Sequence, residues 1–229
     1  MLVSGKNVFN EILKKPESVK KIYLSDKFND KRIISEIEKH KFALKIVNKN
    51  YLDELVNENH QGIIVDMDDY SYYSVEEILK ENGFIVILDH IEDPHNFGAI
   101  IRTCEAAGVD GIIIPKDRSV AVNGTVMKTS AGALMNMKIA MVNNLNNTIA
   151  LLKDKGYWIY CADMGGEDYD KLDYSGSTCL VIGSEGFGVS RLVKESCDFI
   201  ASIPMNGEVN SLNASVAAGI LIYQIIRNK

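Results

Sequence analysis

The stretch Val181-Ile182-Gly183-Ser184-Glu185-Gly186-Phe187-Gly188 decides the fold. An apolar run ends in a loop rich in glycine, whose backbone groups can approach a ligand because no Cβ atoms obstruct them. Open α/β sheets bind ligands where such loops leave the carboxyl ends of the strands. The stretch therefore indicates a strand followed by a binding loop, although a simple tight turn has the same composition.

Two more segments place small polar residues next to apolar runs. The first is Asn96-Phe97-Gly98-Ala99-Ile100-Ile101-Arg102, and the second runs from Ile203-Pro204-Met205 to Asn210-Ser211-Leu212-Asn213. One polar residue of the last group is expected to cap the following helix, which leaves the others to orient a substrate. The arginine, glutamate, serine and asparagines of the three segments suit the binding of an anionic substrate better than hydrolysis by a nucleophilic side chain.

Arg102 lies close to an expected helix start. Asn96 is a candidate N-cap, which places Arg102 on the first or second turn. A cation there opposes the positive end of the helix macrodipole and favours a phosphate or carboxylate partner. A surface salt bridge with Glu105 would meet the same need.

The last two thirds of the chain alternate apolar strands with helices. The expected strands are residues 84–88, 111–115, 138–142, 157–162, 179–182 and 199–203, and the expected helices are 97–107, 145–155, 189–196 and 213–227. Near-continuous apolar strands with intervening helices predict an α/β fold with a mostly parallel sheet covered on both faces.

The first third predicts a separate small α/β unit. Its expected strands are residues 19–25, 42–47 and 62–66, and its expected helices are 31–40 and 51–57. The polar, aperiodic stretch 68–74 marks a boundary, and a short helix is expected at 75–81. We therefore expect domains at 1–70 and 83–229, joined by a linker at 71–82.

Charge is distributed unevenly along the 229 residues, whose formal net charge is −6. Residues 1–49 hold 12 Lys and Arg against 6 Asp and Glu, whereas the remainder holds 13 against 25. A basic first segment is compatible with nucleic-acid contact, and a solvated lysine-rich surface is equally compatible.

Composition argues against several other classes. The chain is 46% hydrophobic, enough for a sizeable core, and has no apolar run of the roughly 20 residues that would span a membrane. No secretory signal is recognisable at the start, so we expect the cytoplasm. The four cysteines form no Cys-x-x-Cys pair and the four histidines share no ligand spacing, so we expect reduced thiols and no metal.

The helix expected at 213–227 is apolar on nearly every face. Such a helix must be buried on more than one side, which favours a homodimer in which it packs against a second subunit. A central core helix in a monomer is the alternative.

Taken in order, the three segments resemble the three signature motifs of the SpoU (TrmH-like) branch of the SPOUT RNA methyltransferases. The resemblance covers residues 84–227. It extends to the first third, because Val3-Ser4-Gly5, Val8 and His60-Gln61-Gly62 resemble the substrate-binding domain of the bacterial 23S rRNA guanosine-2′-O-methyltransferase subfamily. Residues 114–119 are also similar to that subfamily.

The resemblance implies a deep C-terminal trefoil knot, an exception to the rule against threaded chains. It also implies a ribosomal-protein-like RNA-binding domain at the amino end, a homodimer, and S-adenosylmethionine held mainly by backbone groups. The residues expected to bind this cofactor are Gly183, Ser184, Ile203, Met205 and Leu212.

The implied reaction is ribose 2′-O-methylation of a guanosine in 23S rRNA. By this resemblance Arg102 is the expected catalytic residue, which either clamps an RNA phosphate that helps to take the proton or acts directly on the hydroxyl. The clamping role is favoured because a guanidinium stays protonated. Glu185 as the general base is the alternative. The residues expected to position Arg102 and the ribose are Asn96, Glu185, Ser211 and Asn213.

Three other functions stay open on the sequence. A tRNA ribose 2′-O-methyltransferase is the runner-up, although the basic first domain favours rRNA. A non-catalytic RNA-binding factor in ribosome assembly would retain the fold, but the presence of Arg102, Glu185 and Asn213 argues against it. A nicotinamide-dependent oxidoreductase is disfavoured because the glycine loop lies late in the domain.

Overall fold

The computed structural model describes residues 1–229, which divide by their contacts into two compact units. The first unit comprises Met1–Ser71 and Val122–Met135, and the second comprises Tyr72–Ala121 and Asn136–Lys229. Segment 122–135, which the sequence assigned to the second domain, therefore makes its contacts within the first unit. The domain boundaries expected at residues 70 and 83 stay a prediction.

The first unit contains a four-stranded sheet of order β1-β4-β2-β3. Its elements are β1 (Leu2–Ser4), α1 (Lys6–Ile12), η1 (Pro16–Ser18), β2 (Val19–Ser25), α2 (Lys31–His40), β3 (Leu44–Val47), α3 (Lys49–Leu55), β4 (Ile63–Met67), α5 (Gly124–Thr129) and η2 (Ala133–Met135). Strand β2 and helix α2 have the predicted bounds, whereas β1 and α1 were not predicted.

Helix α2 shows how the local sequence fixes an element. The Asp30 side chain accepts a hydrogen bond from the Ile33 backbone N–H at 3.4 Å and caps the helix. Ile33 and Ile37, one turn apart, are both buried. Lys41 ends the helix in the left-handed conformation, with φ 55°.

The second unit contains a six-stranded parallel sheet of order β10-β8-β9-β5-β6-β7. Its elements are β5 (Phe84–Asp89), α4 (Pro94–Ala107), β6 (Gly111–Pro115), β7 (Ile139–Val142), α6 (Leu145–Asp154), β8 (Trp158–Asp168), β9 (Thr178–Gly183), α7 (Arg191–Glu195), β10 (Phe199–Ser202) and α8 (Ala214–Arg227). The predicted parallel α/β fold is confirmed, and the trefoil knot stays a prediction.

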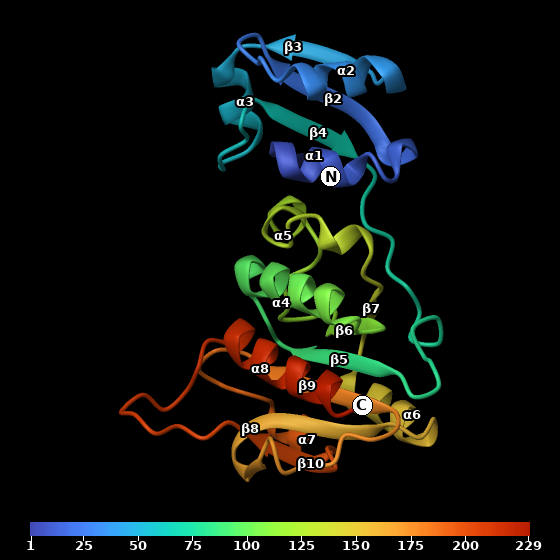
Figure 1. The fold of residues 1–229 in the computed structure, drawn as a ribbon, viewed down its shortest axis with the longest axis vertical. Coiled ribbons are helices and arrows are strands. Elements are labelled where there is room, and N and C mark those ends of the chain that lie inside the picture. Colours follow the sequence, from blue (N-terminus) through green and yellow to red (C-terminus); the bar gives the residue numbers. More distant parts are fainter. The chain divides into compact units, whose positions relative to one another are not determined.

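Helices cover both faces of this sheet (Figure 1). Alternate residues of β5, among them Ile85 and Ile87, join a core cluster with Ile149 of α6 and Val193 of α7. Helices α4 and α8 pack side by side. Strands β5 and β9 are hydrogen-bonded neighbours, but different helices follow them: α4 comes after β5, and α7 comes after β9.

The helix predicted at 75–81 is wrong. The Ser74 and Glu77 side chains cap each other's backbone N–H groups, at 3.3 and 2.7 Å, but only a turn follows. The Tyr157 hydroxyl accepts from the Lys80 N–H and donates to the Lys80 carbonyl, so a tertiary contact satisfies backbone groups that a helix would use.

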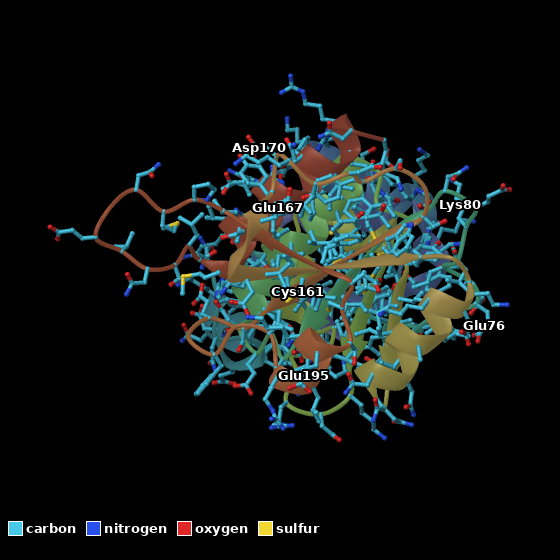
Figure 2. All side chains as sticks on the ribbon, turned by 90° about the horizontal axis from the view of Figure 1, so that it is seen from below. Glu76, Lys80, Cys161, Glu167, Asp170 and Glu195 are labelled. Atoms are coloured by element: carbon cyan, nitrogen blue, oxygen red, sulfur yellow. The ribbon has the colours of Figure 1, made fainter.

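All four cysteines are free thiols, and Cys104, Cys161 and Cys179 are buried. Figure 2 shows Cys161 inside the molecule, whereas the charged Glu195 lies at its periphery. Burial raises the pKa of the Cys104 and Cys179 thiols, which keeps them protonated and unreactive. No helix is long and apolar enough to cross a membrane, and no group of three or more His, Cys, Asp or Glu could hold a metal ion.

Candidate functional site

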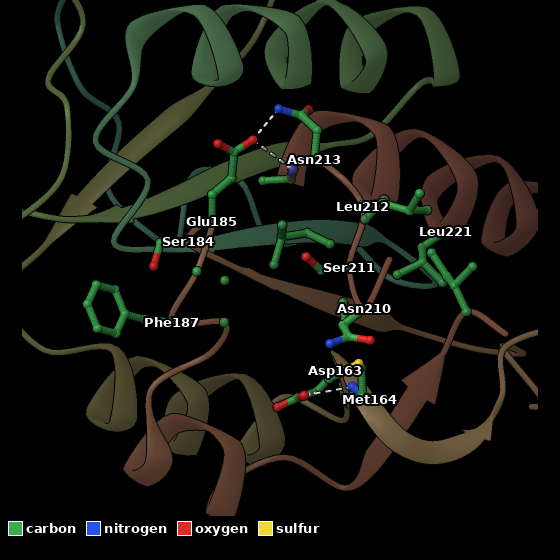
Figure 3. A pocket seen from close by; sticks show the side chains of 18 of the residues that line it. Asp163, Met164, Ser184, Glu185, Phe187, Asn210, Ser211, Leu212, Asn213 and Leu221 are labelled. Atoms are coloured by element: carbon green, nitrogen blue, oxygen red, sulfur yellow. Dashed lines mark hydrogen bonds between the residues drawn. The ribbon is translucent and has the colours of Figure 1, made fainter. Parts of the chain in front are cut away.

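A cavity of about 650 Å³ opens beside the carboxyl ends of β8, β9 and β10. Its lining includes Ala162 and Asp163 of β8, the loop after β9, and the segment that leads from β10 to α8. All five residues expected to bind the cofactor line it, namely Gly183, Ser184, Ile203, Met205 and Leu212. Leu212 and Leu221 add apolar surface beside backbone groups (Figure 3).

The loop after β9 folds back on itself and forms one wall of this cavity. The Ser184 N–H donates to the Gly188 carbonyl at 3.1 Å, and the Gly188 N–H donates to the Ser184 carbonyl at 2.9 Å. A Cβ on Gly183 would lie 2.0 Å from the Gly188 carbonyl carbon, a distance that no side chain tolerates. Glycine at 183 is therefore a steric requirement of the closed loop.

A hydrogen-bonded cluster of three predicted residues joins this loop to α4 and α8. The Asn96 Nδ2 donates to Glu185 Oε1 at 3.2 Å, and the Asn213 Nδ2 donates to Asn96 Oδ1 at 2.9 Å. Asn213 Nδ2 also donates to Glu185 Oε1 (Figure 3). Residues 96, 185 and 213 thus meet at one point, although they are far apart in the sequence.

Asn213 is also the N-cap of α8. Its Oδ1 accepts from the Ser215 and Val216 N–H groups at 2.9 and 3.3 Å. One amide therefore holds the helix start with its oxygen and the cluster with its nitrogen. Ser211 lines the cavity but forms no hydrogen bond with the cluster.

The N-cap expected at Asn96 is wrong. Asp93 caps α4, because its Oδ1 accepts from the His95 N–H at 2.9 Å and Pro94 takes the first helical position. Asn96 lies inside the first turn and is only 8% exposed. The sequence pattern Asp-Pro is itself a helix-start signal that the expectation did not weigh.

Arg102 lies apart from the cluster. Because α4 begins at Pro94, Arg102 falls in the middle of the helix rather than on its first turns, so the macrodipole argument does not apply to it. Its side chain is exposed and forms no hydrogen bond or ion pair. Glu105, its suggested salt-bridge partner, accepts instead from Asn136 Nδ2 at 3.1 Å.

The sequence reasoning missed Asp163, which contributes a carboxylate to the cavity. Its Oδ1 accepts from the Met164 N–H at 2.6 Å, and its Oδ2 lies 2.7 Å from Lys194 Nζ. The hydrogen bond to Asp163 raises the pKa of Lys194, so this ammonium stays charged at neutral pH. The sequence could have indicated Asp163 as a site residue, because it directly follows the predicted strand 157–162.

The arrangement combines a half-apolar cavity with a fixed carboxylate at its edge. Glu185 Oε1 accepts three hydrogen bonds, the third from the Ala214 N–H at 3.4 Å, whereas Oε2 forms no hydrogen bond within the chain. One oxygen therefore fixes the side chain and the other is available to a ligand. Such a site can hold a small molecule and present an acceptor to a second substrate.

Family models match both parts of the chain. A model described as the SpoU rRNA Methylase family matches residues 83–223. The chain belongs to this family. A second model, described as RNA 2′-O ribose methyltransferase substrate binding, matches residues 2–73 of this SpoU family member.

Curated relatives match the SpoU protein along its whole length. It is 40% identical over 237 residues to the Bacillus subtilis protein named "Putative TrmH family tRNA/rRNA methyltransferase YacO", with 99% of this chain and 95% of the relative covered. A Staphylococcus saprophyticus relative with the same family name is 41% identical, with 100% and 96% covered. The family assignment therefore holds for both units.

Solved structures share the fold. The SpoU methyltransferase AviRb from Streptomyces viridochromogenes, in complex with AdoMet, matches with a TM-score of 0.88 and 23% identity, covering 99% of this chain and 89% of that one. The A. aeolicus TrmH/SpoU tRNA modifying enzyme matches with a TM-score of 0.59 and 32% identity, covering 64% and 75%.

Proposed function

We propose that this protein transfers the methyl group of S-adenosylmethionine to a ribose 2′-hydroxyl of RNA, with a guanosine of 23S rRNA as its target. One observation carries the proposal. The cavity at the strand ends gathers all five expected cofactor residues, and Glu185 and Asn213, which are both hydrogen-bonded to Asn96, line its edge. Membership of the SpoU family and the AdoMet named with the AviRb structure support it.

The residues of the cavity fit this cofactor chemically. Leu212 and Leu221 offer apolar surface to an adenine ring, and the closed loop after β9 offers backbone groups to its polar edge. Asp163 and Glu185 offer carboxylates to the ammonium and the sulfonium. When bound, S-adenosylmethionine supplies an activated methyl group with a good leaving group.

The chain's own residues then have to orient the ribose and manage one proton. A ribose 2′-hydroxyl that is to be methylated must be held in a fixed position and must give up its proton, so these residues would have to orient the hydroxyl and accept that proton. Asn96 and Asn213 hold Glu185 at the cavity edge, where Ser211 also lies. We assign to Arg102 the binding of an RNA phosphate next to the reacting ribose, because its guanidinium has no partner within the chain.

Glu185 is the alternative acceptor of the proton. Its Oε2 forms no hydrogen bond within the chain, whereas Oε1 accepts three. A carboxylate in this state can accept a hydrogen bond from a hydroxyl group at the cavity edge. A Glu185→Gln variant separates a structural role of Glu185 from its role as proton acceptor, since it preserves the side-chain shape and removes the charge.

We further propose a homodimer formed through α8. Residues Ala218, Leu221 and Ile222 of this helix are buried within the chain, but Val216 is 49% exposed and Tyr223 is 53% exposed. The apolar outer face is what the sequence predicted for a helix packed on two sides. A second copy of α8 covers this face in the proposal.

The choice of 23S rRNA rests on the first unit. Residues 2–73 match a substrate-binding family model, and the basic excess in residues 1–49 suits an extended RNA backbone. A tRNA substrate is the second candidate, because the matched A. aeolicus structure is named a tRNA modifying enzyme. That match covers only 64% of this chain, which favours rRNA. The proposed compartment is the cytoplasm.

Mapping of 2′-O-methyl groups tests the proposal. Ribosomal and transfer RNA are isolated from cells with and without the gene for this protein, and all 2′-O-methyl positions are compared. The proposal expects the loss of one 2′-O-methylguanosine in 23S rRNA and its return when the gene is restored. Loss of a tRNA modification would move the substrate to tRNA, and unchanged RNA would support a non-catalytic assembly factor.

A further inference from the structure

A second cavity, of about 560 Å³, lies on the other side of the loop after β9. It shares Ser184, Glu185, Phe187 and Gly188 with the first cavity, so this loop is the wall between the two. The rest of its lining comes from residues after β5, together with Arg118 and Ser190. Asn96, Ser184 and Glu185 are expected site residues, whereas no role was expected for His90, Arg118 and Phe187.

The second cavity lies in the crevice at the carboxyl ends of β5 and β9, where the connections that follow these two strands run to opposite sides of the sheet. Asp89 at the end of β5 pairs in register with Gly183 at the end of β9. Helix α4 follows β5 toward β6, whereas α7 follows β9 toward β10, on the opposite side of the sheet order. Ligands of open α/β sheets bind in the crevice that such diverging connections leave.

His90 lines this cavity beside a buried carboxylate. Asp89 is fully buried, and its Oδ2 accepts from the Ser190 N–H at 2.7 Å. The His90 Nδ1 lies close to Asp89 Oδ1, which forms no hydrogen bond. Because Nδ1 faces Asp89, Nε2 is the ring nitrogen available to a ligand.

Arg118 brings an unpaired positive charge to the same cavity. Its side chain is exposed and has no hydrogen bond or ion pair. Its loop is tied to the residues after β5, because the Val120 N–H donates to the Ile91 carbonyl at 2.9 Å. His90 and Arg118 both have left-handed backbones, with φ of 60° and 51°. Such strain is typical of sites where function requires a particular side-chain direction.

Phe187 adds an aromatic surface between the cavities. Its side chain is 95% exposed, which is unusual for phenylalanine. Figure 3 shows its ring on the side of the loop away from Leu212 and Leu221. Unstacked RNA bases bind to exposed aromatic rings, each stacked base contributing roughly 1–3 kcal/mol.

We infer that the second cavity binds the RNA nucleotide whose ribose is methylated. In this arrangement Arg118 binds a backbone phosphate, Phe187 stacks on the base, and His90 Nε2 hydrogen-bonds to the nucleoside. Glu185, which both cavities share, then separates the methyl donor from its acceptor. The inference rests on the proposed function, since it assumes an RNA substrate.

Salt dependence of RNA binding tests the inference directly. A protein that loses one phosphate contact also loses about 0.7 from the slope of log Kd against log salt concentration for single-stranded RNA. We choose Arg118→Asn, because asparagine tolerates the left-handed backbone, and Arg118→Lys, which keeps the charge. An unmodified in vitro transcript of 23S rRNA is the probe, and Lys155→Ala is the control. Lys155 is an exposed cation just before β8, at the amino ends of the parallel strands, whereas the cavity lies at their carboxyl ends.

The expected result is a weaker Kd for Arg118→Asn, by about tenfold, with the slope lowered by about 0.7. Arg118→Lys and Lys155→Ala should keep the wild-type slope. His90→Asn should raise the KM for RNA about tenfold, while the Kd for S-adenosylmethionine and the melting temperature stay unchanged. Wild-type slopes in Arg118→Asn together with a wild-type KM in His90→Asn would overturn the inference.

The outcome is separable from that of the proposed function. If the wild-type protein methylates the transcript and the Arg118 and His90 variants match it, only the inference fails. If the wild-type protein methylates neither rRNA nor tRNA, the proposed reaction fails, and the salt slopes still decide whether Arg118 contacts RNA phosphate.

Discussion

The cluster of Asn96, Glu185 and Asn213 and the lone Arg102 are two very different parts of the proposed site. The cluster residues are bonded to one another and to the start of α8. Arg102 lies exposed in the middle of α4 and has no partner. Bonded polar groups keep one geometry before the substrate arrives, whereas an unpaired cation keeps its hydrogen bonds for a ligand. The difference favours a scaffold role for the cluster and the proposed RNA-binding role for Arg102.

The largest effect should come from Arg102→Ala. Loss of a charged group that acts on the transition state lowers kcat by roughly 10²- to 10³-fold. The melting temperature and the Kd for S-adenosylmethionine should stay at wild-type values, because Arg102 has no partner within the chain. Single-turnover methyl transfer to rRNA and calorimetry measure the two quantities. Unchanged transfer would remove Arg102 from the mechanism.

Gly183→Ala should act on the cofactor rather than on RNA. The added methyl group would lie 2.0 Å from the Gly188 carbonyl carbon, so the loop must open. Overpacking of this kind costs about 1–3 kcal/mol, which corresponds to a loss of cofactor affinity of roughly 10- to 100-fold. Calorimetric titration checks the affinity, with Gly207→Ala as a control for a glycine that has open space around it and no left-handed backbone. Equal affinities in wild type and Gly183→Ala would contradict the closed-loop account.

Asn213→Ala should affect both folding and transfer, unlike Arg102→Ala. It removes the N-cap of α8, which costs about 1 kcal/mol of the free energy of unfolding. It also releases Glu185, so kcat should fall about tenfold. Denaturant unfolding and methyl-transfer kinetics report the two losses. Asn213→Asp is the discriminating variant, because it keeps the cap but places a second carboxylate beside Glu185. Full activity in Asn213→Asp would show that the cluster is only a helix cap.

The smallest effect is expected for Asp163→Asn. This change removes the ion pair with Lys194 and one carboxylate from the cavity. Because the pair is partly exposed, its contribution is about 0–1 kcal/mol, and the Kd for S-adenosylmethionine should rise only a few-fold. The kcat should not change. A loss as large as that of Arg102→Ala would make Asp163 part of the reacting centre.

The sequence predicted the sheet of the second unit well because its strands are buried on both faces and hence apolar throughout. Strand β6 has the predicted bounds, 111–115. Strand β8 was predicted to end at 162 but continues to Asp168. Its last part contains Gly165 and Gly166 and no apolar pattern, and a Cβ on Gly166 would lie 2.1 Å from the Ile200 carbonyl oxygen. The extension of β8 depends on its close contact with β10, and a contact between distant segments cannot be predicted from the local sequence pattern.

The site was predictable to the extent that its residues follow strands. Gly183 and Ile203 directly follow apolar runs, and both line the cavity. The bonds of Asn96 to Glu185 and Asn213 depend on tertiary packing of α4 and α8, so spacing alone could not predict them. The position of Arg102 in the middle of α4 was also not predicted, because the helix begins at Pro94 rather than after Asn96.

Identification of the methylated atom tests the central claim most directly. The protein is incubated with S-adenosylmethionine labelled in its methyl group and an unmodified 23S rRNA transcript, and the RNA is digested to nucleosides. The account predicts label in 2′-O-methylguanosine, and labelling that is slower by roughly 10²- to 10³-fold when Arg102→Ala replaces the wild type. Label in a base-methylated nucleoside, or no label in RNA from a folded protein that binds S-adenosylmethionine, would contradict it.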